Sequence, residues 1–313
     1  MGNLAFIGCS GDVSSYALSK NKLIDLIIRI CYKVFKKVYL DDCISGIDID
    51  EGFRIWNIDL FNIYKHLLFN KKKLEKEITK FIKLHDISSC ISSKSFKDKY
   101  NLSNCVVWEH NGRILFRVIL KETVNVMCSQ YDLELYNTEF YIISNNCDNE
   151  VIRLVKLFSQ DVRFLTVISA NYSSIENQID QLSEEYGLSV RLTEDFSGNF
   201  DKAKIIISVD GSMPKNCRVL KNSFIINLGK KPVDIINAAI IDKAEIELPE
   251  NIKYIKDKIL TSAYKNHELA EIIILHKLGI ERIEDQYNIS ENHIKQIIKS
   301  FIEDGYIIKK VYI

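Results

Sequence analysis

Residues 163–187 read RFLTVISANYSSIENQIDQLSEEYG, and this stretch decides the fold class of the 313-residue chain. The apolar, β-branched and aromatic run at 163–169 predicts a buried strand. A helix follows, in which Ser173 and Glu176 have capping-box spacing and Gly187 is the expected C-cap. Three further apolar runs predict strands at 188–193, 205–209 and 224–228. Strands of this kind alternating with a helix favour a parallel sheet covered on both faces, as in a Rossmann-like α/β domain.

The turn after the strand at 163–169 lacks the glycines of a dinucleotide-binding unit, which carries G-x-G-x-x-G there. Residues 170–175 read ANYSSI, so the usual pyrophosphate cradle is missing. The helix N-terminus still offers N–H groups and hydroxyls to an anion. An acidic residue stands roughly 20 residues further on, where a ribose-binding carboxylate is expected. The candidate cofactor-binding residues are Asn171, Ser173, Ser174, Glu194 and Asp195. Both a bound NAD(P) and a scaffold without nucleotide remain open.

The composition is that of a globular chain, with 47% hydrophobic and 27% charged residues. Basic and acidic residues each number 42, so no global charge attracts nucleic acid. None of the eight cysteines forms a C-x-x-C pair, and no histidine has a second histidine three or four residues away. We therefore predict no metal site and expect reduced thiols in a cytoplasmic protein. No apolar run is long enough to span a membrane.

Three domains are predicted from the order of these patterns. An N-terminal α/β domain is expected over 1–148, a Rossmann-like domain over 149–250, and a helical or winged-helix-like module over 251–313. The first boundary is placed at the polar stretch Asn145–Asn149, directly after an apolar run at 140–143. The dipeptide Asn111-Gly112 between two apolar runs is a strong hairpin signal, although its second arm could equally begin a helix.

The last segment has the outline of a winged helix-turn-helix, with a short helix at 282–287, a longer helix at 291–304 and a strand at 306–312. Residues of the longer helix that could face a DNA groove are Asn292, Lys295, Gln296 and Lys299. Residues 281–313 carry five basic and six acidic side chains, whereas a DNA-binding module is normally basic. DNA binding and a packing or protein-contact role both remain open.

Five stretches resemble, in order, the glutamyl-tRNA reductases: FIG at 6–8 with AL at 17–18, VYLDDC at 38–43, LFRV at 115–118, AKIIIS at 203–208 and FIINL at 224–228. The resemblance implies a catalytic domain with Cys43 as nucleophile, a domain for NADPH, a role in tetrapyrrole synthesis and a homodimer. Four features depart from the family. The long connecting helix before the nucleotide domain is much shortened, and the long dimerisation helix is not evident at the C-terminus. Cys43 is followed by Ile44-Ser-Gly-Ile47 in place of Asn-Arg-Thr-Glu, and the glycine motif of the NADPH loop is absent.

Asp41 and Asp42 beside Cys43 would raise the pKa of its thiol, which favours an unreactive loop cysteine. The sequence therefore predicts a diverged relative of NAD(P)-dependent reductases with weak or lost catalysis. The alternative is a ligand-sensing regulator or a protein-interaction scaffold with a C-terminal winged-helix-like module.

Overall fold

The computed structural model describes residues 3–8, 44–50, 53–59, 71–92, 111–196, 199–214, 217–231, 233, 235, 237–253, 264–280 and 289–312. The chain divides into two compact units. The first combines residues 1–110, 248–265 and 275–281, and the second combines residues 111–247, 266–274 and 282–313. Neither unit ends at residue 148, where the sequence suggested a boundary.

The first unit contains a four-stranded sheet in the order β2-β3-β1-β4. The central β1 pairs in parallel with β3 and β4, and β2 is the antiparallel partner of β3. The side chains of Leu4, Ala5 and Ile55 are fully buried in this sheet. The bounds are β1 (Asn3–Gly8), β2 (Ile44–Asp50), β3 (Phe53–Asp59), α3 (Lys71–Leu84) and β4 (Ile87–Ser92).

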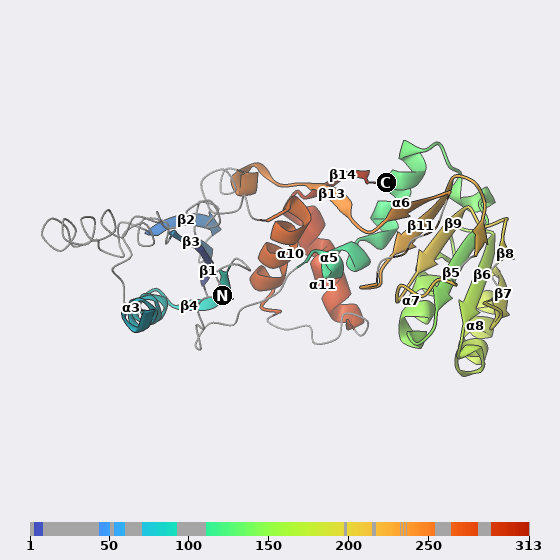
Figure 1. The fold of residues 1–313 in the computed structure, drawn as a ribbon, viewed down its shortest axis with the longest axis horizontal. Helices are drawn as coiled ribbons and strands as arrows, with labels where there is room; N and C mark the ends of the chain where they lie inside the picture. Colours follow the sequence, from blue (N-terminus) through green and yellow to red (C-terminus); the bar gives the residue numbers. More distant parts are fainter. Residues whose placement is uncertain are drawn as a thin grey trace, which may run out of the picture. The chain divides into compact units, whose positions relative to one another are not determined.

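The second unit is organised around a six-stranded, fully parallel sheet in the order β12-β11-β9-β5-β6-β7 (Figure 1). Its strands are β5 (Phe140–Ser144), β6 (Phe164–Ser169), β7 (Ser189–Thr193), β9 (Ile205–Ser208), β11 (Ser223–Asn227) and β12 (Ala238–Ile241). Numbered along the chain, these strands stand in the order 3-2-1-4-5-6, which is the Rossmann order. The expected α/β class with a Rossmann-like domain is confirmed.

The first strand of this sheet is β5 and not the strand at 163–169, which is β6. The sequence analysis assigned residues 140–143 to the N-terminal domain, yet β5 lies at the centre of the sheet, between β6 and β9. Each residue of β5, β9 and β11 is buried, because covered faces on both sides favour continuous apolar runs. The helices α7 (Asp148–Phe158) and α8 (Tyr172–Tyr186) lie side by side along this sheet (Figure 1).

Two further groups of elements complete the second unit. Ahead of the sheet come α5 (Arg113–Val118) and α6 (Leu120–Gln130). The C-terminal part has α11 (Glu291–Glu303) and the antiparallel pair β13 (Ala244–Glu247) and β14 (Ile307–Val311). Of α10 (Asn266–Lys277), residues 266–274 belong to this unit. The backbone of Val311 donates to Gln130 Oε1 at 3.1 Å, which ties β14 to the end of α6.

Several local predictions can be compared with these elements. The Asn-Gly hairpin is wrong, since α5 follows Gly112 directly; the helical alternative is confirmed. The capping box at Ser173 is also wrong, because α8 begins one residue earlier and its N-cap is Asn171, whose side chain makes no capping bond. Gly187 is confirmed as a left-handed C-cap with φ 63°. The predicted short helix at 282–287 lies outside the described residues.

Candidate functional site

The carboxyl end of β5 is the point where the strand order of the large sheet reverses, because β6 lies on one side of it and β9 on the other. In open α/β sheets, ligands bind in the crevice at such a switch point, and the turn after the first strand receives the phosphate. Here that turn runs from Ser144 to Asp148 and reads SNNCD, without glycine. The position of a phosphate-binding turn therefore falls here, one strand before the turn at 170–175.

Asp210, which follows β9, accepts a hydrogen bond from the backbone of this turn across the switch point. The Asn145 amide nitrogen donates to Asp210 Oδ2, and the Ser212 amide nitrogen donates to Oδ1, each at 3.0 Å. The Asn145 side chain also donates to Ser212 Oγ at 2.8 Å, and the Cys147 amide nitrogen donates to Ser144 Oγ at 3.1 Å. The carboxylate of Asp210 thus accepts a hydrogen bond that a phosphate oxygen would otherwise accept.

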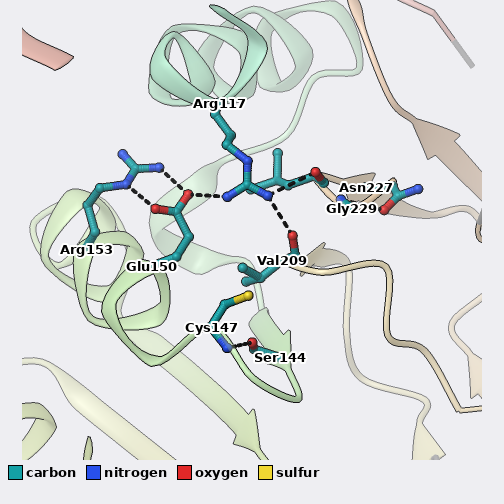
Figure 2. A network of polar contacts seen from close by, with 9 residues as sticks. Arg117, Ser144, Cys147, Glu150, Arg153, Val209, Asn227 and Gly229 are labelled. Carbon is teal, nitrogen blue, oxygen red and sulfur yellow. Dashed lines mark hydrogen bonds and ion pairs between the residues drawn. The ribbon is translucent and has the colours of Figure 1, made fainter. Parts of the chain in front are cut away.

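A guanidinium group lies against the strand ends beside this turn. Arg117 of α5 is only 1% exposed. One of its terminal nitrogens donates to the carbonyl oxygens of Val209 at 2.8 Å and of Leu228 at 3.0 Å, directly after β9 and β11. The other donates to Glu150 Oε1 at 3.0 Å. Figure 2 shows the arginine pointing from its helix into the space between α7 and the two strand ends.

The first turn of α7 carries two acidic residues, Asp148 and Glu150. Glu150 is buried and accepts from Arg117 and also from both Nε and a terminal nitrogen of Arg153, at 2.7 and 2.8 Å. Carboxylates in the first turn stabilise a helix by offsetting the positive end of its dipole. The charge that would attract a ligand phosphate to this helix N-terminus is therefore compensated by the chain itself.

The loop after β11 packs tightly on the loop after β9. Asn227 accepts from the Gly229 amide nitrogen at 3.0 Å and donates its own side-chain nitrogen to the Lys231 carbonyl at 2.8 Å. A Cβ on Gly229 would collide with the backbone of Asp210 and Gly211. Only glycine fits at 229, which leaves little space at the carboxyl ends of β9 and β11.

The position of Arg117 depends on the helix that carries it. Buried Glu271 of α10 accepts from the backbone nitrogens of Gly112 at 3.2 Å and Leu115 at 2.9 Å, at the start of α5. Gly112 has φ 75°, and a Cβ there would collide with the ring of His267. The start of α5 is therefore fixed by a carboxylate and a histidine from α10.

Cys147 lies in the turn at the switch point, where it is the N-cap residue of α7. Partial burial raises the pKa of its thiol above the ordinary value, and the charge of Asp210 raises it further, against an opposing effect of Arg117 and a hydrogen bond with Ser144. A catalytic thiol needs a lowered pKa. The raised pKa of Cys147 therefore works against a role as nucleophile.

Of the residues proposed from sequence, Ser174 contacts the last residue of the switch-point turn, and Glu194 and Asp195 lie two strands away from it. Asn171, Ser173 and Ser174 are exposed at the start of α8, where Ser174 Oγ lies 2.8 Å from Asp148 Oδ2. Glu194 and Asp195 are exposed after β7, the edge strand two places from β5. Their binding of a dinucleotide stays a prediction. Cys43 lies outside the described residues, directly before β2.

Sequence reasoning missed Arg117, Glu150 and Asp210 as members of one cluster. One signal was present: Arg117 is the only charged residue in the apolar run 114–120, which is typical of a buried, paired side chain. Its partners stand 33, 92 and 111 residues further along the chain, so local patterns could not identify them.

Within the described residues, no group of three or more histidine, cysteine, aspartate or glutamate side chains is placed to hold a metal ion. Of the helices in the described part of the chain, none combines the length and apolar character needed to cross a membrane.

Comparisons with known proteins complete this description. No family model matches the sequence, and no curated protein matches it. Among solved structures, L-tryptophan dehydrogenase from Nostoc punctiforme has a TM-score of 0.31 at 12% identity, over 95% of this chain and 78% of the other. Ligand-free 5-ketofructose reductase of Gluconobacter sp. strain CHM43 has a TM-score of 0.28 at 9% identity, over 96% and 98%.

Ornithine carbamoyltransferase from Pyrococcus furiosus has a TM-score of 0.23 at 9% identity, over 66% of this chain. The chain spans 58% of the length of that transferase. Likenesses this low carry no argument about function, and the Rossmann-like assignment rests on the strand order of the large sheet.

Proposed function

We propose that this protein is a diverged relative of NAD(P)-dependent reductases that has lost dinucleotide-dependent catalysis, and that its Rossmann-like unit serves as a rigid scaffold. The observation that carries the proposal is the closure of the switch-point crevice by the chain's own side chains. Arg117 bonds the two carbonyl oxygens beyond β9 and β11, and Asp210 accepts from the backbone of the turn after β5.

A dinucleotide would meet both a steric and an electrostatic obstacle here. Its pyrophosphate needs free N–H groups at the start of α7, and glycines that allow the backbone to approach. The turn after β5 has no glycine, the carboxylate of Asp210 accepts from its Asn145 nitrogen, and Asp148 lies in the first turn of α7. Glu150 is paired with Arg117 and Arg153, so the repulsion of a pyrophosphate comes from Asp148 and Asp210, because like charges at short range repel.

The closer relation to glutamyl-tRNA reductase rests on the sequence stretches that resemble that family. A role in tetrapyrrole synthesis, NADP as the cofactor, Cys43 as a remnant nucleophile and a homodimer are proposals that depend on that resemblance. On this proposal the dinucleotide affinity of the ancestral site is lost together with its glycines.

Isothermal titration of the full-length chain with NADPH and with NADH tests the proposal. We expect no saturable heat up to millimolar cofactor, a concentration well above the affinity of a functional dinucleotide site. Saturable binding in the micromolar range to either cofactor would refute the loss of function. Titration with inorganic pyrophosphate serves as a control for phosphate binding alone.

A second candidate function is a ligand-controlled regulator whose C-terminal module contacts DNA, as a winged-helix-like segment would. One observation favours it: Asn292, Lys295, Gln296 and Lys299 are all exposed on α11, as a recognition helix requires. Against it, Lys309 and Lys310 of β14 pair with Glu247 and Glu245 of β13 at 3.2 and 3.4 Å, which neutralises the strand that would form the wing.

A gel-shift assay with random duplex DNA at low salt separates these possibilities, because phosphate contacts bind most tightly at low ionic strength. A shifted band that is lost in the double substitution Lys295→Glu and Lys299→Glu would support the regulator. The absence of a shift at high micromolar protein would remove its DNA-binding form.

A further inference from the structure

A cavity lies at the amino ends of strands of the large sheet, whereas the switch point lies at the carboxyl ends. Its volume is about 560 Å³, which is within the range of small-molecule sites. Lys204, Asn222 and Asn237 contribute to its lining, and they stand directly before β9, before β11 and before β12. The cavity is therefore at the amino ends of three neighbouring strands.

Aromatic rings form one part of this cavity. The rings of Tyr131 and Phe224 pack with their centroids 4.7 Å apart at an interplanar angle of 43°. Phe224 is buried, whereas Tyr131 is partly exposed and can offer a ring face to a ligand. Ala238 and Ala239 of the edge strand β12 also line the cavity, and their side chains are single methyl groups.

One positive charge faces the cavity without an acidic neighbour in its lining. The ammonium group of Lys204 lies 5.4 Å from the centroid of the Phe224 ring and donates to the Asn222 carbonyl oxygen at 2.7 Å. An ammonium group has three donors, so donors remain for a ligand. Among the described residues that line the cavity, none is an aspartate or glutamate. The site therefore favours an anion.

Two asparagines with left-handed backbone conformations line the cavity. Asn222 and Asn237 have φ angles of 62° and 73°, in the left-handed region that asparagine tolerates better than most residues. The Asn222 amide nitrogen donates to the Asn237 carbonyl oxygen at 3.2 Å, which joins the turns before β11 and β12. Within the described part of the chain, neither side-chain amide has a hydrogen-bond partner, so both are available to a polar ligand.

We propose that this cavity binds a small aromatic carboxylate, with its ring against Tyr131 and its carboxylate on the ammonium group of Lys204. A ring stacked on an aromatic face and a cation–carboxylate pair are both favourable in a partly dry pocket. The hydroxyl of Tyr131 accepts from Gln130 at 3.1 Å and keeps a proton to donate to a hydroxyl or carbonyl group on the ligand. The proposal is independent of whether the switch point binds a dinucleotide.

The test uses the full-length chain and three probes of similar size. Benzoate has the ring and the charge, benzamide has the ring alone, and cyclohexanecarboxylate has the charge alone. Saturation-transfer NMR and isothermal titration should show benzoate binding at least about tenfold more tightly than either of the others, since each lacks one of the two contacts. Equal affinity for all three, or no benzoate binding at about 10 mM, would overturn the proposal.

Variants assign the binding to this cavity. Lys204→Met should weaken benzoate binding about tenfold or more, and Lys204→Arg should restore most of it because the charge returns. Lys221→Met is the matched control, since Lys221 is an exposed lysine that does not line the cavity. Unchanged affinity in Lys204→Met, or an equal loss in Lys221→Met, would show that benzoate binds elsewhere. If Lys204→Met does not fold, Tyr131→Leu tests the same site, because loss of the tyrosine ring should also weaken benzoate binding.

Discussion

Replacing Arg117 with methionine should lower the free energy of unfolding of the second unit by about 3–5 kcal/mol, because it removes one partner of a buried ion pair. Toward the described residues, the side chain of Arg117 donates to two carbonyl oxygens and to Glu150. A hydrogen bond to a charged group contributes about 1.5–3 kcal/mol. Methionine fills part of the vacated volume but leaves the carbonyls of Val209 and Leu228 without this donor.

Arg153→Met is the matched control, since it removes a guanidinium from the same carboxylate at a site whose side chain is 19% exposed. Glu150 keeps Arg117 in that variant, so the expected cost is about 1 kcal/mol. Arg117→Lys should fall between the two, because an ammonium group cannot reproduce the planar fork of guanidinium donors.

Hydrogen exchange measured across a urea series, with peptides covering 205–209 and 223–228, reports on the second unit alone. Monitoring these peptides matters because the chain has two units and its global unfolding need not be two-state. A loss below about 0.5 kcal/mol in Arg117→Met, or a loss no larger than in Arg153→Met, would refute the assignment of Arg117 as the buried link between α5 and the strand ends.

Two further predictions concern backbone strain and a buried thiol. Gly112→Ala should destabilise the protein by about 2–4 kcal/mol, because alanine is strained in the left-handed region and its Cβ would collide with the His267 ring. Gly187→Ala should cost about 1 kcal/mol, because a Cβ there has no atom nearby. Thermal unfolding of the two variants measures both losses, and equal losses would contradict the packing of Gly112 against His267. Burial raises the pKa of the Cys128 thiol from 9.0 to about 11, so the folded state holds this proton to a higher pH than the unfolded state does. The contribution of the neutral thiol to the free energy of unfolding is therefore complete below pH 9 and is lost as the pH rises through 11. At pH 9 its thiolate fraction is roughly 50-fold below that of an unperturbed thiol, and alkylation followed by peptide mass spectrometry should be slower by at least that factor; labelling of Cys128 as fast as that of a free thiol would contradict the burial.

The strands β6, β9 and β11 were predictable because covered faces on both sides favour continuous apolar runs. The partly exposed β7 was predicted as well, whereas β12 was not. Which strand comes first was not predictable, since the order of strands in a sheet is a tertiary property. The polar stretch after β5 indicated a domain boundary, yet Asn145 is polar there because its backbone and side chain bond Asp210 and Ser212 across the switch point. A polar turn that hydrogen-bonds to a distant loop cannot be distinguished from a polar linker between domains by its amino-acid composition.

The Asn111-Gly112 dipeptide illustrates the same limit at a shorter range. Its glycine does adopt a positive φ, as the hairpin prediction required, but here that conformation starts α5. The deciding partner is Glu271, 159 residues away, which accepts from the Gly112 nitrogen. The local signal identified the conformation of the residue and not the element that follows it.

The backbone amide of Asn145 offers the most direct test of a closed switch point. In a 15N-labelled full-length chain titrated with NADPH, we expect the amide signals of 145–149 to keep their positions up to millimolar cofactor, because Asp210 already accepts from the Asn145 nitrogen at 3.0 Å. A saturable shift of these amides at micromolar NADPH would contradict the account, since it would place a phosphate at the N-terminus of α7.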